Sequence, residues 1–414
     1  MSTLQTDTLA PKAEPRPSNT VWQNRSFLIL FLSGAVISFG SKVYELALPL
    51  IIYQMTHSSV YMATMRAIEF LPNLLLAMFI GVLVDRFNKK RWTQTMVFLQ
   101  AVILLALFLL VQFGKASLLY FYIAGFFLMT CNYGYGNARV SIVKLAVPKH
   151  LLTSANAKFS LIWTLIDIMG PAISGIILMF SALHNGLLIT ACSFSLALLL
   201  LSFLDTDSFA PAAGRSAFLQ EFREGWQELL ANRPLWLITL LVIFLNATAG
   251  MFDAMVVFFA KDHLHLANSQ LGMVLSSAGL GGLAGSMLVE LCRKYIPTGR
   301  LLGITILSLG AAYLVMVLAD SAWLMCVSLF FTGMIGTIEN ICIWTYRQET
   351  TPSHLIGRIS GITGSIFKLG MVFTIYGSGW IAETLGTKCV FLGAAVSNLL
   401  IFLVYRRLSL WGLK

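Results

Sequence analysis

The sequence predicts an all-α polytopic membrane protein with twelve transmembrane helices in two pseudo-symmetric six-helix halves. Of its 414 residues, 57% are hydrophobic and only 11% are charged, and the mean hydropathy is +0.80. Soluble domains carry roughly a quarter charged residues, so a soluble enzyme of this length would lack the polar surface that must cover its core. A disordered chain is excluded because too much apolar surface has to be buried.

Apolar stretches recur along the chain at the length of about 20 residues that a membrane-spanning helix needs. Twelve spans are expected at residues 27–55, 58–84, 91–113, 117–147, 156–180, 185–204, 234–260, 268–291, 299–319, 322–346, 355–381 and 387–406. They divide the chain into an N-terminal half at 25–204 and a C-terminal half at 234–407. Residues 1–24 are expected to be a short disordered cytoplasmic tail, and residues 408–414 a second cytoplasmic tail.

The net charge of +10 is distributed unevenly between the loops. With twelve spans, the loops opposite the termini contain only Lys115, Lys261 and Lys388. Cytoplasmic loops of membrane proteins carry an excess of Lys and Arg. We therefore expect both termini in the cytoplasm and a multi-pass protein of the plasma (inner) membrane. The positive charge then reports orientation, and no nucleic-acid partner is expected.

Residues 205–233 form the longest break between spans and contain an amphipathic pattern. Apolar residues recur there at helical spacing, with charged residues between them: Phe218, Leu219, Phe222, Trp226, Leu229 and Leu230. This pattern predicts an amphipathic helix in a cytoplasmic linker, lying at the membrane interface. A packed connector without a regulatory role is the alternative.

The two halves share features at a constant offset of 204 residues. Pro148-Lys-His150 aligns with Pro352-Ser-His354, and Ser174-Gly175 aligns with Ser378-Gly379. Duplicated six-helix halves with a site between them are typical of secondary transporters.

The segment after the second span, Gly81-Val-Leu-Val-Asp85-Arg86-Phe-Asn-Lys89-Lys90, closely resembles the signature of the major facilitator superfamily. The resemblance implies a gating motif, made by Gly81, Asp85, Arg86, Lys89 and Lys90, that latches the cytoplasmic helix ends in one state of alternating access. Asn88 replaces the glycine of the family and is expected in a left-handed turn. The two lysines are expected to lie at the anionic inner leaflet.

A finer resemblance covers residues 137–175, which look like the exporter branch of macrolide-efflux and siderophore-export proteins. It rests on Asn137-Ala-Arg139, where members usually have proline first, and on Gly170-Pro171-Ala-x-x-Gly175. In the family, the second element is associated with antiport. A kink at Pro171 and close helix approach at Gly175 are the structural alternative. The resemblance implies a monomer whose partners are a small-molecule substrate, protons and the lipid bilayer.

Ionisable residues at membrane depth are costly and are therefore functional candidates. Five carboxylates are candidates for proton coupling, with the first two leading: Asp253, Asp167, Glu339, Glu45 and Glu69. Three cations suit an anionic substrate, and four aromatic residues are expected to line an apolar part of its site: Lys42, Arg66 and Lys368, with Tyr44, Trp163, Phe367 and Tyr376. The alternatives are neutralising ion pairs for Lys42–Glu45 and Arg66–Glu69, and ordinary packing for the aromatic residues.

Export of a siderophore-like anion or a macrolide is one of three functions that the sequence leaves open. The same fold also supports an importer or a lipid flippase, because a fold fixes neither direction nor cargo. A membrane-embedded transferase is disfavoured, because the six histidines fall in loops or at span ends and form no catalytic motif. His263-x-His265 is expected in a solvated loop, and no metal and no cofactor are predicted.

Overall fold

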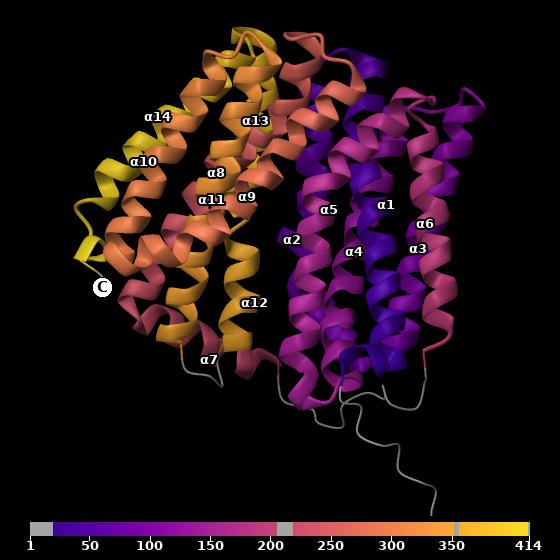
Figure 1. Ribbon diagram of the computed structural model, residues 1–414, viewed down its shortest axis with the longest axis horizontal. Coiled ribbons are helices and arrows are strands. Elements are labelled where there is room, and N and C mark those ends of the chain that lie inside the picture. Colours follow the sequence, from indigo (N-terminus) through magenta and orange to yellow (C-terminus); the bar gives the residue numbers. More distant parts are fainter. Residues whose placement is uncertain (1–19, 205–217, 352–355, 413–414) are drawn as a thin grey trace, which may run out of the picture.

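The computed structural model describes residues 20–204, 218–351 and 356–412, and within these ranges the chain forms helices and no strand (Figure 1). The first six helices are α1 (Arg25–Thr56), α2 (Ser59–Arg86), α3 (Lys89–Gln112), α4 (Leu118–Ala146), α5 (Leu152–Met179) and α6 (Asn185–Ser202). After α7 (Phe218–Ala231) come α8 (Arg233–Asp262), α9 (Asn268–Tyr295), α10 (Thr298–Val317), α11 (Ala322–Thr350), α12 (Ile356–Ile366), α13 (Leu369–Leu385) and α14 (Thr387–Tyr405).

Nine helices in the described ranges are long and apolar enough to cross a membrane. They are α1, α3, α5 with the turn before it, α6, α8, α9, α10, α11 and α14. The predicted apolar stretches coincide with helices to within about one turn at either end, with one exception. That exception is the stretch at 355–381.

The prediction of one continuous helix at 355–381 is wrong, because the chain breaks at Phe367 and Lys368, between α12 and α13. No proline stands at this break. The Asn246 side chain on α8 donates a hydrogen bond to the Phe367 carbonyl at 3.0 Å. A carbonyl freed inside a membrane protein must find such a partner. The neighbouring helix therefore stabilises the break, and no local sequence pattern reveals it.

Replacing Asn246 by alanine is expected to destabilise the chain by about 1–3 kcal/mol, because the Phe367 carbonyl loses its amide partner in the bundle interior. Thermal unfolding of purified protein measures the change. Thr384→Val is the control, since that exposed hydroxyl bonds only to the Trp380 carbonyl of its own helix. A melting temperature for the alanine variant equal to that of the control would show that the break does not depend on Asn246.

The helices gather in two groups, α1–α6 on one side of Figure 1 and α8–α14 on the other. In the first group α1 packs on α5 and α6, while α4 packs on α2 and α3. In the second group α8 packs on α13 and α14, while α11 packs on α9 and α10. The main contacts between the groups are α5 with α9 and α2 with α13.

The α5–α9 contact is close because glycines face each other there. A Cβ placed on Gly175 would lie 2.5 Å from the Asn268 carbonyl oxygen and 3.0 Å from the Gly272 Cα. One turn earlier, the Ser276 hydroxyl accepts a hydrogen bond at 3.0 Å from the Ala172 backbone N–H, just after Pro171. The predicted close helix approach at Gly175 is confirmed.

The predicted tails are shorter than expected at both ends. Residues 1–19 lie outside the described residues, but Val21–Gln23 form a short helix in which Val21 is buried. Near the C-terminus, Ser409–Gly412 form another short helix with Leu410 fully buried. The buried Tyr405 hydroxyl donates to the Gly299 carbonyl at 2.8 Å. Both segments therefore pack against the bundle instead of extending as tails.

The predicted amphipathic helix of the linker is present as α7, at the lower end of the bundle in Figure 1. Leu229 is buried against Leu235 on α8 and against Ile359 and Ile362 on α12. Residues 205–217 and the side chains of 218–222 lie outside the described part of the chain. The described turns of α7 pack as a connector beneath α12.

Candidate functional site

Two cavities meet in the middle of the bundle. One, of about 620 Å³, is lined by side chains of α1, α4 and α5; the other, of about 790 Å³, is lined mainly by α8, α11 and the α12–α13 break. Tyr133 and Asn137 on α4 line both cavities. The two spaces are therefore neighbours along α4, with one helix group on either side.

Lys42 lies between two carboxylates in the first cavity. Its ammonium is 2.8 Å from Glu45 Oε2 and 3.0 Å from Asp167 Oδ1. The Asp167 side chain is 61% exposed, so this ion pair faces the cavity. The Lys42–Glu45 pair follows from their spacing on one helix, whereas Asp167 reaches Lys42 from α5. Asp167 is thus an ion-pair partner of Lys42.

Arg66 and Glu69 also form the ion pair that their spacing predicts, at 3.0 Å. The buried Tyr44 hydroxyl donates to the other oxygen of Glu69 at 2.9 Å. Both oxygens of this buried carboxylate are therefore hydrogen-bonded. The Arg66 charge is balanced within its own helix before any substrate binds.

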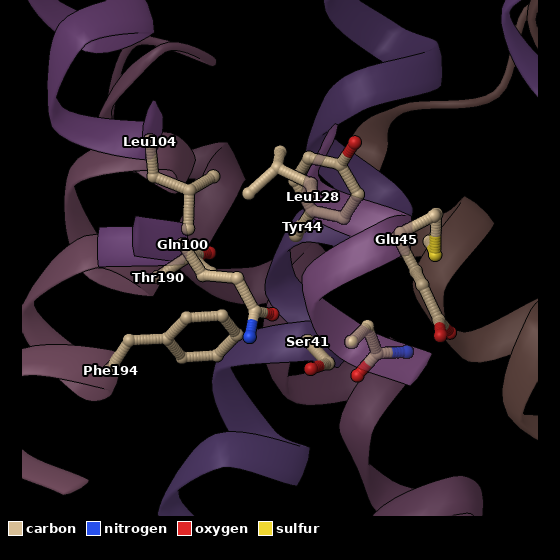
Figure 2. A pocket seen from close by; sticks show the side chains of 10 residues that line it. Ser41, Tyr44, Glu45, Gln100, Leu104, Leu128, Thr190 and Phe194 are labelled. Carbon is tan, nitrogen blue, oxygen red and sulfur yellow. The ribbon is translucent and has the colours of Figure 1, made fainter. Parts of the chain in front are cut away.

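A small pocket of about 40 Å³, lined by both polar and apolar side chains, opens between α1, α3, α4 and α6 (Figure 2). Ser41, Glu45 and Asn132 line this pocket and the 620 Å³ cavity alike, so it is a side branch of that cavity. The Gln100 amide N–H donates to the Met96 carbonyl at 3.2 Å. A pocket of this volume has room for about two water molecules. Tyr44 lines this branch.

Asp253 and Glu339 line the second cavity without an ion-pair partner. Among the described residues, no cation comes within 4.0 Å of either carboxylate. Glu339 is 8% exposed, and its Oε2 has no hydrogen-bond partner. The ionisable neighbours of Asp253 are Arg66 and Tyr313. These carboxylates can accept a proton without breaking an ion pair.

Lys368 is the N-cap residue of α13 and lies where the two cavities meet. Its ammonium is 2.9 Å from the Tyr133 hydroxyl and 5.8 Å from the centre of the Phe70 ring. No carboxylate pairs with it in the part of the chain that the structure describes. Phe367 lines the same cavity. The helix break thus turns a cation and an aromatic ring toward the bundle centre.

The other predicted aromatic residues differ in position. Trp163 lines the 620 Å³ cavity. Tyr376 is 45% exposed and is absent from the lining of the two central cavities. Its place in a substrate site stays a prediction.

Sequence reasoning missed Arg139 as a binding residue. It projects from α4 into the 620 Å³ cavity, with its guanidinium carbon 4.0 Å from the centre of the Trp163 ring. Arg139 appeared only within the Asn137-Ala-Arg139 motif. Its position inside the expected span 117–147 could have identified it, because a charged residue at membrane depth is costly and is therefore a functional candidate.

The gating motif is described only in part, since the surroundings of Gly81 and the side chain of Asp85 lie outside what the structure describes. Arg86 is exposed, whereas Lys89 and Lys90 are buried. The Lys90 ammonium donates to the carbonyls of Ser202, at 3.2 Å, and Leu204 at the end of α6. The expected leaflet contact is wrong for this lysine, because it binds the free carbonyls of a helix C-terminus.

Asn88 does not adopt the expected left-handed turn, since its φ is −61°. Instead its side chain accepts a hydrogen bond from the Arg91 backbone N–H at 3.1 Å. Asparagine is among the preferred N-cap residues. Its role here is to begin α3.

The two helix groups are joined by hydrogen bonds at the end of the bundle that carries the loops after α1, α3, α5 and α8. There Glu383 of α13 accepts hydrogen bonds from the Ser58 hydroxyl, at 3.1 Å, and from the Ser59 N–H and hydroxyl, at 3.2 and 2.9 Å. Tyr53 donates to Asp262 at 3.4 Å. At the other end, which carries the basic loops, no hydrogen bond joins the groups within the described ranges.

Glu383→Ala is expected to loosen this junction, because three hydrogen bonds to one carboxylate are lost. Spin labels at His57→Cys and Leu385→Cys, in a chain whose exposed Cys192 and Cys389 are serine, should show a larger population at long distance. Glu290→Ala, which removes an exposed acid from α9, is the control. An unchanged distance distribution in the Glu383 variant would rule out this carboxylate as a latch.

The comparison with protein families decides the identity of the fold. The model of the Major Facilitator Superfamily matches residues 30–375. This chain belongs to that superfamily. It is therefore a multi-pass membrane protein with a transport role.

Named relatives are similar at low identity. The multidrug efflux pump Tap of Mycolicibacterium fortuitum is 28% identical over 260 residues, which cover 61% of this chain and 62% of the relative. Tap of Mycobacterium tuberculosis strain H37Rv is 25% identical over 403 residues, 90% of each chain. The crystal structure of a bacterial homologue of the iron transporter ferroportin, in an inward-facing state, matches with a TM-score of 0.75 at 15% identity, covering 94% of this chain and 98% of that one. The last match shows the fold alone.

Proposed function

We propose that this chain is a secondary active transporter that exports small organic molecules by proton antiport. Its α12 and α13 together make one broken span, which gives twelve spans in two six-helix halves. Broken helices beside a central site are a recurrent feature of transporter folds. The family match and the efflux-pump relatives support export, and the two central cavities supply a place for cargo.

In this proposal the basic end of the bundle faces the cytoplasm, in a plasma (inner) membrane. The described ends of the chain lie beside the basic loops, since Asn24 donates to the Ala146 carbonyl and Tyr405 to the Gly299 carbonyl, which favours this orientation. The hydrogen bonds that join loops and helix ends of the two groups lie at the opposite end. The arrangement is that of a transporter open toward the cytoplasm and closed toward the outside.

Proton coupling is assigned first to Asp253 and Glu339. The observation that carries this assignment is the absence of an ion-pair partner for both carboxylates in the described structure, although both line the larger cavity. Asp167, Glu45 and Glu69 are held in ion pairs, so protonating them would break a contact. They are secondary candidates.

Cells with and without the gene provide the test. Accumulation of a labelled macrolide and of a carboxylate siderophore is measured across imposed pH gradients. Export predicts lower accumulation of at least one compound in cells that carry the gene, with a difference that disappears when the gradient is collapsed. Higher accumulation in cells that carry the gene would identify an importer. If neither compound accumulates differently in cells with and without the gene, the proposal is contradicted.

A further inference from the structure

Arg139 is a cation inside the bundle that forms neither an ion pair nor a hydrogen bond within the described residues. Its Nε is buried without a partner, while the side chain lines the 620 Å³ cavity. A guanidinium carries five N–H donors in a fixed plane and stays charged. An unpaired arginine that faces a cavity can therefore donate hydrogen bonds to an anionic ligand.

An aromatic wall holds this guanidinium in place. Arg139 lies 4.0 Å from the centre of the Trp163 ring and 5.6 Å from that of Phe159. The two rings are stacked on each other at 5.7 Å, and Phe159 also contacts Phe27 edge-on at 5.4 Å. Stacking on the ring fixes the plane of the Arg139 guanidinium and leaves its outer N–H groups free to bind a ligand.

The second helix group contains a related pair that is closed off. Arg347 lies 4.8 Å from the centre of the Phe367 ring, and Phe367 follows Trp163 by the repeat offset of 204 residues. Arg347, however, is 3% exposed, is absent from the lining of both cavities and donates to Thr363. At the repeat offset of 204 residues, Arg139 corresponds to Ile343, so Arg347 lies four residues beyond the matching position. Of these two stacked arginines, Arg139 opens into a cavity.

Of the cations that line the first cavity, Arg139 is the one that no acid contacts within the described residues. Lys42 is paired with both Glu45 and Asp167, so these three groups together carry one formal negative charge. Arg66 is balanced by Glu69. A carboxylate entering this cavity would compete with acids at Lys42, but it would meet no competitor at Arg139.

We propose that Arg139, stacked on Trp163, binds the carboxylate of an organic anion that carries a flat apolar group. The fork accepts both carboxylate oxygens, as arginine does in bidentate pairs. The apolar part of the ligand lies along the Trp163 side of the cavity. Calling this ligand the cargo depends on the proposed transport function, whereas the site itself does not.

Binding of 4-nitrobenzoate to the full chain in phosphatidylcholine nanodiscs tests the site. A bound nitroaromatic ring quenches nearby tryptophan, so the Trp163 signal is taken as the difference between wild type and Trp163→Phe. We expect saturable quenching, with binding at least tenfold weaker for 4-nitrobenzamide, which has the same ring but no charge. Equal affinity for 4-nitrobenzoate and 4-nitrobenzamide would overturn the proposal. This comparison uses the wild-type chain, so it does not depend on the folding of an Arg139 variant.

Variants locate the charge that binds. Arg139→Gln should weaken 4-nitrobenzoate binding at least tenfold, or about 1.4 kcal/mol. Arg139→Lys should give an intermediate affinity, because it keeps the charge but loses the fork. Lys144→Gln removes the same charge from an exposed position on α4 and should change nothing. Equal losses in the Arg139 and Lys144 glutamine variants would mean that binding follows net charge only.

A lipid phosphate is the competing source of an anion. Nanodiscs that contain phosphatidylglycerol should bind 4-nitrobenzoate as well as phosphatidylcholine nanodiscs do. Loss of binding in the anionic bilayer would assign the site to a lipid headgroup and overturn the proposal. All these measurements need no pH gradient, so failure of proton antiport and failure of the anion site are separate results.

Discussion

Replacing Asp253 by asparagine is expected to abolish transport driven by a pH gradient while leaving the chain folded. The carboxylate lines the larger cavity and takes part in no ion pair in the described structure. Asparagine has nearly the same shape but cannot carry a proton. The initial rate of gradient-driven export, measured in everted membrane vesicles with the exported compound, should fall at least tenfold. Thermal stability should not fall, because no salt bridge is lost.

Glu339→Gln is the parallel variant, and Asp320→Asn is the matched control. Asp320 pairs with Lys388 at 2.6 Å at the end of the bundle away from the basic loops, far from the cavity lining. Its neutralisation should leave the transport rate unchanged. Retention of full coupling in both the Asp253 and the Glu339 variants would refute the assignment of proton coupling to this pair.

The second large effect is expected from Gly175→Ala. The new Cβ would meet backbone atoms of Asn268 and Gly272 on α9, which cannot rotate away as a side chain can. Overpacking of this kind costs about 1–3 kcal/mol, and here it pushes apart the helices that join the two groups. The yield and melting temperature of purified protein should both fall.

Gly377→Ala on α13 serves as the control for this helix substitution. A Cβ at Gly377 meets no atom within 4 Å. Alanine favours a helix over glycine by up to about 1 kcal/mol, so the control should be as stable as wild type or more stable. Equal stability of the two alanine variants would show that the α5–α9 contact can relax.

Local sequence pattern was enough for the helices and for the short-range ion pairs. Apolar runs of the right length placed the helix ends, and the three-residue spacing placed Lys42 by Glu45 and Arg66 by Glu69. Both features depend on residues less than a few turns apart. They can be predicted because a helix fixes the positions of its own side chains.

Features made by two distant segments escaped prediction. The break at Phe367 depends on Asn246 from another helix, and the Asp167 carboxylate finds Lys42 across the α1–α5 contact. This second pairing lowers the rank of Asp167 as a proton carrier. Arg139 was missed for a similar reason: its freedom from any acid is visible only when the surrounding helices are in place.

Purified protein in liposomes tests the central claim most directly. The lumen is buffered at acidic pH with a pH-sensitive dye, and the compound that cells export is added outside at neutral pH. Proton antiport predicts that the compound accumulates in the lumen while protons leave it, and that the Asp253→Asn variant does neither. Accumulation that proceeds equally without a pH gradient, or with no movement of protons, would contradict the account.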